Sequence, residues 1–168
     1  NTGDTLRQLH RYDEALAAHS TARALYEQTG NTGGLAIAWG NTGDTLRQLH
    51  RYDEALAAHT TARTLHEQTG DTHGQATALS NVGSIFRGLR RYGEAVAAGG
   101  GAAEMLESLG DLTSAGEAFG ELATSLDAAG AASTIVRDTW LRSARAYDAA
   151  GATEKGEQSR SNAAAKGP

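Results

Sequence analysis

The sequence predicts an all-α protein built as a right-handed solenoid of antiparallel helix hairpins. The first observation is a repeat, because Asn1–Gly30 recurs at Asn41–Gly70 with three substitutions: Ser20/Thr60, Ala24/Thr64 and Tyr26/His66. A period of about 20–50 residues is typical of stacked arrays. The second observation is composition, with 39% hydrophobic but only 5% aromatic residues and Pro168 as the one proline. Uninterrupted helices with an alanine-rich core follow from that usage.

Each repeat contains two helical segments joined by a short link. The first is expected over Gly34–Leu49, where small and apolar residues fall on one helical face: Ala36, Trp39, Gly43 and Leu46. The second is expected over Tyr52–Thr69, with acids in its first turn and Gly70 as its stop. Because so few residues join them, the two helices must run antiparallel. Asp71 then supplies the N-cap of the next first helix.

The period continues beyond the duplicated part. Asn81–Gly110 matches Asn41–Gly70 at 13 of 30 positions, and a fourth, degraded repeat follows with one inserted residue before Gly151. We expect a single array over 1–168, with its first repeat truncated at the start. The expected parts are repeats 1–32, 33–72, 73–112 and 113–152 and a C-terminal capping helix over 153–165.

These residues resemble the tetratricopeptide repeat (TPR) family. The positions that carry the family's signature are Trp39, Thr42-Gly43, Leu46, Ala55, His59 and Ala62, and in the third repeat Leu79, Val82-Gly83, Phe86, Ala95, Gly99 and Ala102. Thr42 replaces a leucine, and His59 and Gly99 replace an aromatic residue. The long 40-residue repeat is similar to those of kinesin light chains, spindle-orientation adaptors and actinobacterial TPR regulators. The resemblance implies a TPR-like superhelix that binds proteins.

Charge and composition argue against several classes of protein. The net charge is −5 with acids and bases interspersed, which does not give the basic footprint of a nucleic-acid binder. The sequence has no apolar run long enough to span a membrane and no cysteine. We therefore expect a cytoplasmic protein without nucleic-acid or membrane partners.

No pattern in the sequence predicts catalysis, a cofactor or a metal. His59 and His66 lie two helical turns apart, but the twin repeat has Tyr26 in place of the second histidine. Gly99-Gly100-Gly101 lacks the strand and the lysine of a phosphate-binding loop and is interpreted as a weakened helix. Paired acids at helix starts are explained by the helix dipole. We expect a protein that is not an enzyme.

A partner is expected on the stripe of the first helices that faces away from the second. This stripe comprises Ile37, Asn41, Asp44 and Gln48, then Thr77, Asn81, Ser84 and Gly88, then Glu117, Glu121, Thr124 and Ala128. The candidate peptide-binding residues are Asn41, Asp44, Arg47, Gln48, Asn81, Ser84 and Arg87. An asparagine can both donate to and accept from a peptide backbone, and the arginines would favour acidic side chains. Alternatively, the stripe is merely solvated and Asp44 pairs with Arg47. Because Ser84 replaces the acid, we expect the charge of Arg87 to be free.

Two functions fit these expectations. The first is a scaffold that binds a peptide or a partner segment in its concave groove. The second is an intramolecular regulatory or sensor segment of a larger ATPase or transcription regulator, in which case the partner is another domain of the same polypeptide.

Overall fold

The computed structural model describes residues 2–167, which form nine α-helices and no strand. The helices are α1 (Thr2–Gln8), α2 (Tyr12–Gln28), α3 (Thr32–Gln48), α4 (Tyr52–Thr69), α5 (Thr72–Gly88), α6 (Tyr92–Ser108), α7 (Leu112–Ala128), α8 (Ser133–Ala149) and α9 (Thr153–Ala164). Odd-numbered helices are the first helices of the hairpins and even-numbered helices are the second. The predicted boundaries of α3 and α4 are confirmed to within two residues.

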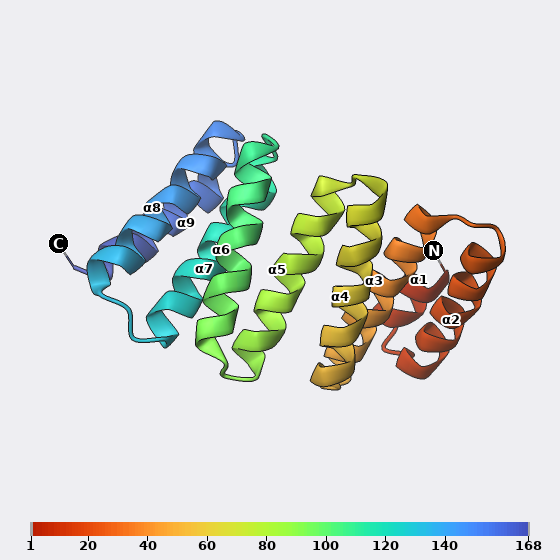
Figure 1. Cartoon of the computed structure of the whole chain (residues 1–168). Helices are drawn as coiled ribbons and strands as arrows, with labels where there is room; N and C mark the ends of the chain where they lie inside the picture. The colour runs from red at the N-terminus through yellow and green to blue at the C-terminus, as the bar shows by residue number, and fades with distance from the viewer. Residues whose placement is uncertain (1, 168) are drawn as a thin grey trace. The chain divides into compact units, whose positions relative to one another are not determined.

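Figure 1 labels these helices along the chain. They pack into two compact units, which divide between Asn81 and Val82, inside α5. The N-terminal unit, Asn1–Asn81, contains α1–α4 and the beginning of α5. The C-terminal unit, Val82–Pro168, contains the end of α5 and α6–α9.

Left-handed residues end the helices at regular positions. The link from first to second helix contains His10, His50 or Arg90, with φ of 58°, 58° and 59°. A non-glycine residue rarely adopts this conformation. At His50 the ring assists the turn, since its Nδ1 lies 2.8 Å from the Tyr52 hydroxyl.

The inserted residue predicted in the fourth repeat lies between α7 and α8. The link there spans residues 129–132, whereas residues 49–51 and 89–91 suffice in the preceding repeats. The later start of α8 explains why Gly151, with φ of 76°, falls one residue out of phase.

Both units have a core made chiefly of alanine, as the composition predicts. Ala36, Ala55 and Ala62 are at most 1% exposed in the N-terminal unit. The C-terminal unit adds larger buried side chains, among them Phe119 and Val136. Small side chains let neighbouring helices approach closely, so dispersion contacts between backbones make up for the few aromatic residues.

Three of the first helices, α3, α5 and α7, begin with side-chain caps. The Asp71 side chain accepts a hydrogen bond from the Gly74 amide at 2.8 Å, which confirms the predicted N-cap of α5. Asn31 and Asp111 do the same for α3 and α7. These caps satisfy amides that have no partner within their own helix.

Candidate functional site

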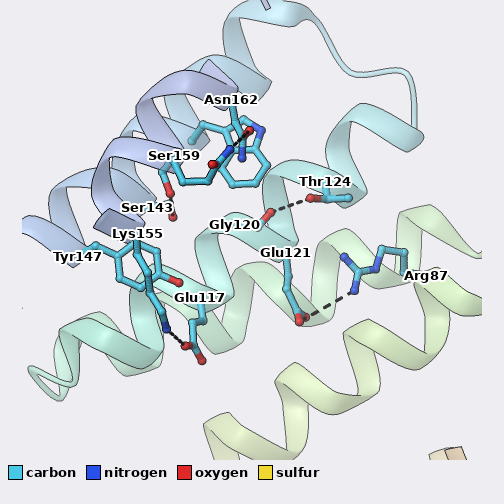
Figure 2. A pocket seen from close by; sticks show the side chains of 12 residues that line it. Arg87, Glu117, Gly120, Glu121, Thr124, Ser143, Tyr147, Lys155, Ser159 and Asn162 are labelled. Atoms are coloured by element: carbon cyan, nitrogen blue, oxygen red, sulfur yellow. Dashed lines mark hydrogen bonds and ion pairs between the residues drawn. The ribbon is translucent and has the colours of Figure 1, made fainter. Parts of the chain in front are cut away.

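Each unit has an open cavity between two successive first helices, above a second helix. In the C-terminal unit the cavity has a volume of about 450 Å³. Figure 2 shows its side chains, which come from α5, α7, α8 and α9. In the N-terminal unit the cavity has a volume of about 310 Å³ and lies between α3 and α5 above α4. We call these the C-terminal cavity and the N-terminal cavity.

The N-terminal cavity is lined by much of the predicted stripe. Ile37, Asn41 and Asp44 line it from α3, and Thr77 and Asn81 line it from α5. The Ile37 side chain is exposed (57%) despite being apolar. The remaining wall contains three histidines and one further acid: His59, His66, His73 and Asp71.

The other predicted site residues lie elsewhere. Arg87 lines the C-terminal cavity. Arg47, Gln48 and Ser84 line neither of the two cavities in the described part of the chain. Part of the predicted stripe therefore lines a cavity, and sequence periodicity did not show which of its members do.

Side chains on successive first helices bond to each other at an offset of 37 residues. In the N-terminal unit the Asn41 amide donates to the Asp4 carboxylate at 3.4 Å. In the C-terminal unit the Ser84 hydroxyl donates to the Glu121 carboxylate at 2.6 Å. Part of the predicted stripe thus holds neighbouring hairpins together, a third alternative to peptide binding and to solvation.

The expectation that the charge of Arg87 is free is wrong. Its Nη2 lies 3.9 Å from Oε1 of Glu121, an acid on the next first helix (Figure 2). The third repeat has Ser84 where the second has Asp44, but another acid, Glu121, lies near Arg87 although it is 34 residues further along the chain. The local pairing of Asp44 with Arg47 is also absent from the described residues. Arg47 makes no ion pair there, and its buried Nε has no hydrogen-bond partner.

Asp44 lies against a buried histidine instead. Its Oδ1 is 3.5 Å from Nε2 of His59, whose side chain is 1% exposed. Burial acts to raise the pKa of the Asp44 carboxyl, but the approach of His59 and the charges of Arg47 and Arg7 outweigh it, so the pKa lies below its ordinary value. Asp44 is therefore ionised at neutral pH.

A second histidine–aspartate pair lies at the rim of the same cavity. Nδ1 of His66 is 2.8 Å from Oδ2 of Asp71. The hydrogen bond from the Gly74 amide lowers the pKa of the Asp71 carboxyl, against a desolvation penalty and with help from His66. The twin repeat has Tyr26 and Asn31 at these two positions, so the pair is specific to the second repeat.

The C-terminal cavity has a more balanced charge. Lys155 of α9 pairs with Glu117 of α7 at 2.6 Å, and its Nζ lies 5.3 Å from the centre of the Tyr147 ring (Figure 2). Trp140 forms an aromatic wall and remains partly exposed. The sequence placed Glu117 on the stripe, but it gave no sign that Lys155 would reach it.

Two buried serines of the C-terminal cavity were also missed. Ser143 of α8 donates to the Gly116 carbonyl of α7 at 2.7 Å, and its oxygen lies 3.0 Å from that of Ser159 in α9. The degraded fourth repeat gave no phase from which to align them.

Residues 2–167 contain no group of three or more His, Asp or Glu placed to hold a metal ion. None of the helices in that range combines the length and the apolar character that a membrane span needs.

Solved structures share this arrangement of hairpins. BtubC (BKLC) from P. vanneervenii matches with a TM-score of 0.68 and 16% identity over 98% of this chain and 76% of that one. A putative kinesin light chain from P. anserina with nearly identical TPR-like repeats matches with a TM-score of 0.68 and 13% identity, over 98% of this chain and 91% of that one. The apo form of RapI matches with a TM-score of 0.65 and 12% identity, over 98% of this chain and 66% of that one. At these identities the likeness is one of fold, and it confirms the predicted all-α, TPR-like class.

The sequence itself matches a family model. No curated protein matches this sequence. The model described as tetratricopeptide repeat matches residues 1–68 and 34–108, which together cover more than half of the chain. The two matches overlap because the duplicated hairpins satisfy the model in two registers. The chain therefore belongs to the tetratricopeptide repeat family, as its signature residues predicted.

Proposed function

We propose that the chain binds an extended segment of a partner protein along its first helices. TPR folds commonly mediate protein–protein interaction. The observation that carries the proposal is that each unit has a cavity at the same place in the hairpin, between two first helices. Each cavity combines an exposed apolar or aromatic wall with polar side chains, the composition that protein-binding surfaces need.

Asn81 supports a backbone-binding role in the N-terminal cavity. Its side chain has no hydrogen-bond partner among the described residues, and it lines the cavity from α5. A primary amide can accept from a peptide N–H and donate to a peptide carbonyl at once. Asn41 is less available, since its amide already donates to Asp4. Asn81 is therefore the better of the two candidates for binding a main chain.

The test is selection from a displayed library of random peptides, followed by affinity measurements on variants. Asn81→Ala should weaken the selected peptides about 2- to 10-fold, because one hydrogen bond contributes about 0.5–1.5 kcal/mol net. Ile37→Ala should weaken them further by removing the exposed apolar side chain from the wall. Arg87→Glu should affect peptides that reach the C-terminal cavity, where it would face Glu121.

A control comes from the opposite side of the N-terminal unit. There a cleft between α2 and α4 is lined by Trp39 and Thr61, so Thr61→Ala should leave the affinity unchanged. Peptides that respond to Thr61→Ala but to none of the first-helix variants would place the binding surface on the second helices and contradict the proposal.

A further inference from the structure

Three pairs of side chains on successive first helices stand 37 residues apart in the sequence. In one of them, which we call the open pair, the two side chains are not hydrogen-bonded to each other. Asn41 donates a long hydrogen bond of 3.4 Å to Asp4, and Ser84 donates one of 2.6 Å to Glu121. The pair between them in sequence is Asp44 and Asn81, and no hydrogen bond joins these two side chains. The N-terminal cavity lies at this position, with both residues in its wall.

The open pair is chemically the same as a closed one. Asp4 with Asn41 and Asp44 with Asn81 are both an aspartate and an asparagine, so composition does not explain the difference. In the open pair Asp44 and Asn81 both line the cavity, and a carboxylate and an amide each carry oxygen acceptors. A group that donates several hydrogen bonds would satisfy both of them at once.

A buried histidine beside the open pair lacks hydrogen-bond partners. His59 lines the cavity and is fully buried, yet neither of its ring nitrogens makes a hydrogen bond. Its approach to Asp44 at 3.5 Å is longer than a good hydrogen bond. His19, the equivalent residue beside Asp4 and Asn41, also lacks partners for both ring nitrogens, so the histidine is common to both pairs and the open pair differs from the closed one in the cavity beside it.

The charges facing this cavity favour a cation. Asp44 and Asp71 are both in its wall, with side chains 25% and 46% exposed. His66 is engaged by Asp71, and His73 faces them from α5. Arg47 is near enough to influence Asp44, but it lies beyond ion-pair distance and outside the cavity lining. The chain as a whole carries a net charge of −5.

We propose that the N-terminal cavity binds an arginine side chain of the partner segment. The guanidinium would donate to the Asp44 carboxylate and to the Asn81 amide oxygen, and the alkyl part would lie on Ile37. Guanidinium suits this site because its donors form a rigid fork and it is weakly hydrated. The inference rests on the proposed function and specifies the partner of that site. It replaces, for this cavity, the expectation of an acidic peptide.

The test uses capped tripeptides as probes. Ac-Ala-Arg-Ala-NH₂ is titrated into the ¹⁵N-labelled protein and compared with the citrulline and glutamate versions. Citrulline has nearly the shape of arginine without its charge. The arginine probe should shift the resonances of Asp44 and Asn81, weaken as ionic strength rises, and bind at least roughly tenfold more tightly than citrulline, as expected for charged hydrogen bonds.

Matched variants assign the effect to one carboxylate. Asp44→Asn should remove the preference for arginine over citrulline, while Asp4→Asn, the same change in the near-identical first repeat, should retain it. Asn81→Ala should weaken the arginine probe several-fold and serves if Asp44→Asn fails to fold. Equal binding of arginine and citrulline, or an unchanged preference in Asp44→Asn, would overturn the inference.

The outcomes separate this inference from the proposed function. Library-selected peptides that bind this cavity without a basic residue would overturn the arginine site and leave the proposed function standing. Selected peptides that are indifferent to every first-helix variant would overturn both. Selected peptides with a basic residue whose replacement by glutamine costs affinity in the native protein but not in Asp44→Asn would support both.

Discussion

Gly43 of α3 lies directly against the imidazole ring of His59 in α4. A Cβ at Gly43 would fall 2.6 Å from two atoms of that ring. The first repeat has the same relationship between Gly3 and His19, at 2.3 Å. In these two repeats the TPR signature glycine is thus the place where a first helix accommodates a ring from its second helix.

Gly43→Ala should therefore destabilise the chain. The ring is fully buried and cannot move aside without displacing its neighbours. Overpacking of this kind costs about 1–3 kcal/mol, and better helix propensity offsets at most about 1 kcal/mol of it. The measurement is the free energy of unfolding in urea.

Gly40→Ala is the matched control in the same helix. A Cβ there would meet nothing within 4 Å, so the change should raise the free energy of unfolding by up to about 1 kcal/mol. If Gly43→Ala raises the free energy of unfolding as Gly40→Ala does, helix propensity and not packing dominates, and the prediction about Gly43 is wrong.

The glycine run of α6 gives a second prediction, that Gly100→Ala stabilises. Its Cβ would lie 4.0 Å from Cδ2 of Leu122, an ordinary contact, so about 0.5–1 kcal/mol of helix propensity should be recovered. Hydrogen exchange should be faster around Gly100 than around Thr60, its equivalent in the preceding repeat. Equal protection would show that the run does not weaken α6.

Gly83→Ala is the informative counterpart in α5. Its Cβ would come within 3.2 Å of the Gly99 backbone nitrogen and 3.4 Å of the Ala95 carbonyl oxygen. Backbone atoms cannot rotate away as a side chain can, so this variant should be less stable than the native chain in the same denaturation experiment.

The sequence predicted what depends on local periodicity. One face of a 3.6-residue helix and the small residues Gly43 and Ala55 were enough to predict the hairpin. The inserted residue near Gly130 was also detected, because a strict 40-residue period makes a shift of one visible. Such features need no knowledge of how one hairpin is placed on the next.

Pairs between hairpins could not be predicted, because they depend on how one hairpin is placed on the next. Arg87 meets Glu121, and Lys155 meets Glu117, only because successive first helices pack in a particular register. The sequence does not specify that register, since many offsets bring some acid near some base. Likewise, Asp44 lies against His59 of α4 and not against Arg47, which is one turn along its own helix.

His19 should make the N-terminal unit sensitive to acid. Burial lowers the pKa of this fully enclosed ring; the carboxylates of Asp4 and Asp44 oppose the shift, and the charges of Arg7 and Arg23 reinforce it. A ring with a lowered pKa is neutral when folded and gains a proton on unfolding. Its contribution is therefore complete above about pH 6.5, its unfolded pKa, and declines as the pH falls, by at most about 1.4 kcal/mol per pH unit.

The pH effect is measured by urea unfolding at pH 7.5 and pH 5.5 in the native chain and in His19→Phe. The native chain should lose more stability between the two conditions than the variant does. Because neither nitrogen of His19 has a hydrogen-bond partner, the variant should be at least as stable at pH 7.5. Parallel pH profiles would assign the acid sensitivity to other groups.

The last prediction concerns how α9 is held on the C-terminal unit. The hydroxyl of Ser143 has one hydrogen, which it donates to the Gly116 carbonyl, so Ser159 must donate to Ser143. Both serines are buried, at 0% and 3% exposure. The chain of two bonds links α7, α8 and α9.

Ser143→Ala should cost more than Ser159→Ala. The first change removes both bonds and leaves the buried Ser159 hydroxyl without an acceptor, at about 1–3 kcal/mol, whereas the second leaves the bond to Gly116 intact. The double variant should cost less than the sum of the two single changes, since the bond they share is lost only once. Ser161→Ala, an exposed serine of the same helix, should change little.

Hydrogen exchange measures which helices lose stability in Ser143→Ala. Amides of α9 should exchange faster in Ser143→Ala than in the native chain, because α9 would open more often, while amides of α3 and α4 in the N-terminal unit should keep their rates. Repeat arrays are stabilised chiefly by nearest-neighbour contacts, so a lost link at α9 stays local. Strictly additive single changes, or an equal loss of protection in α3, would show that the two serines do not act as a link.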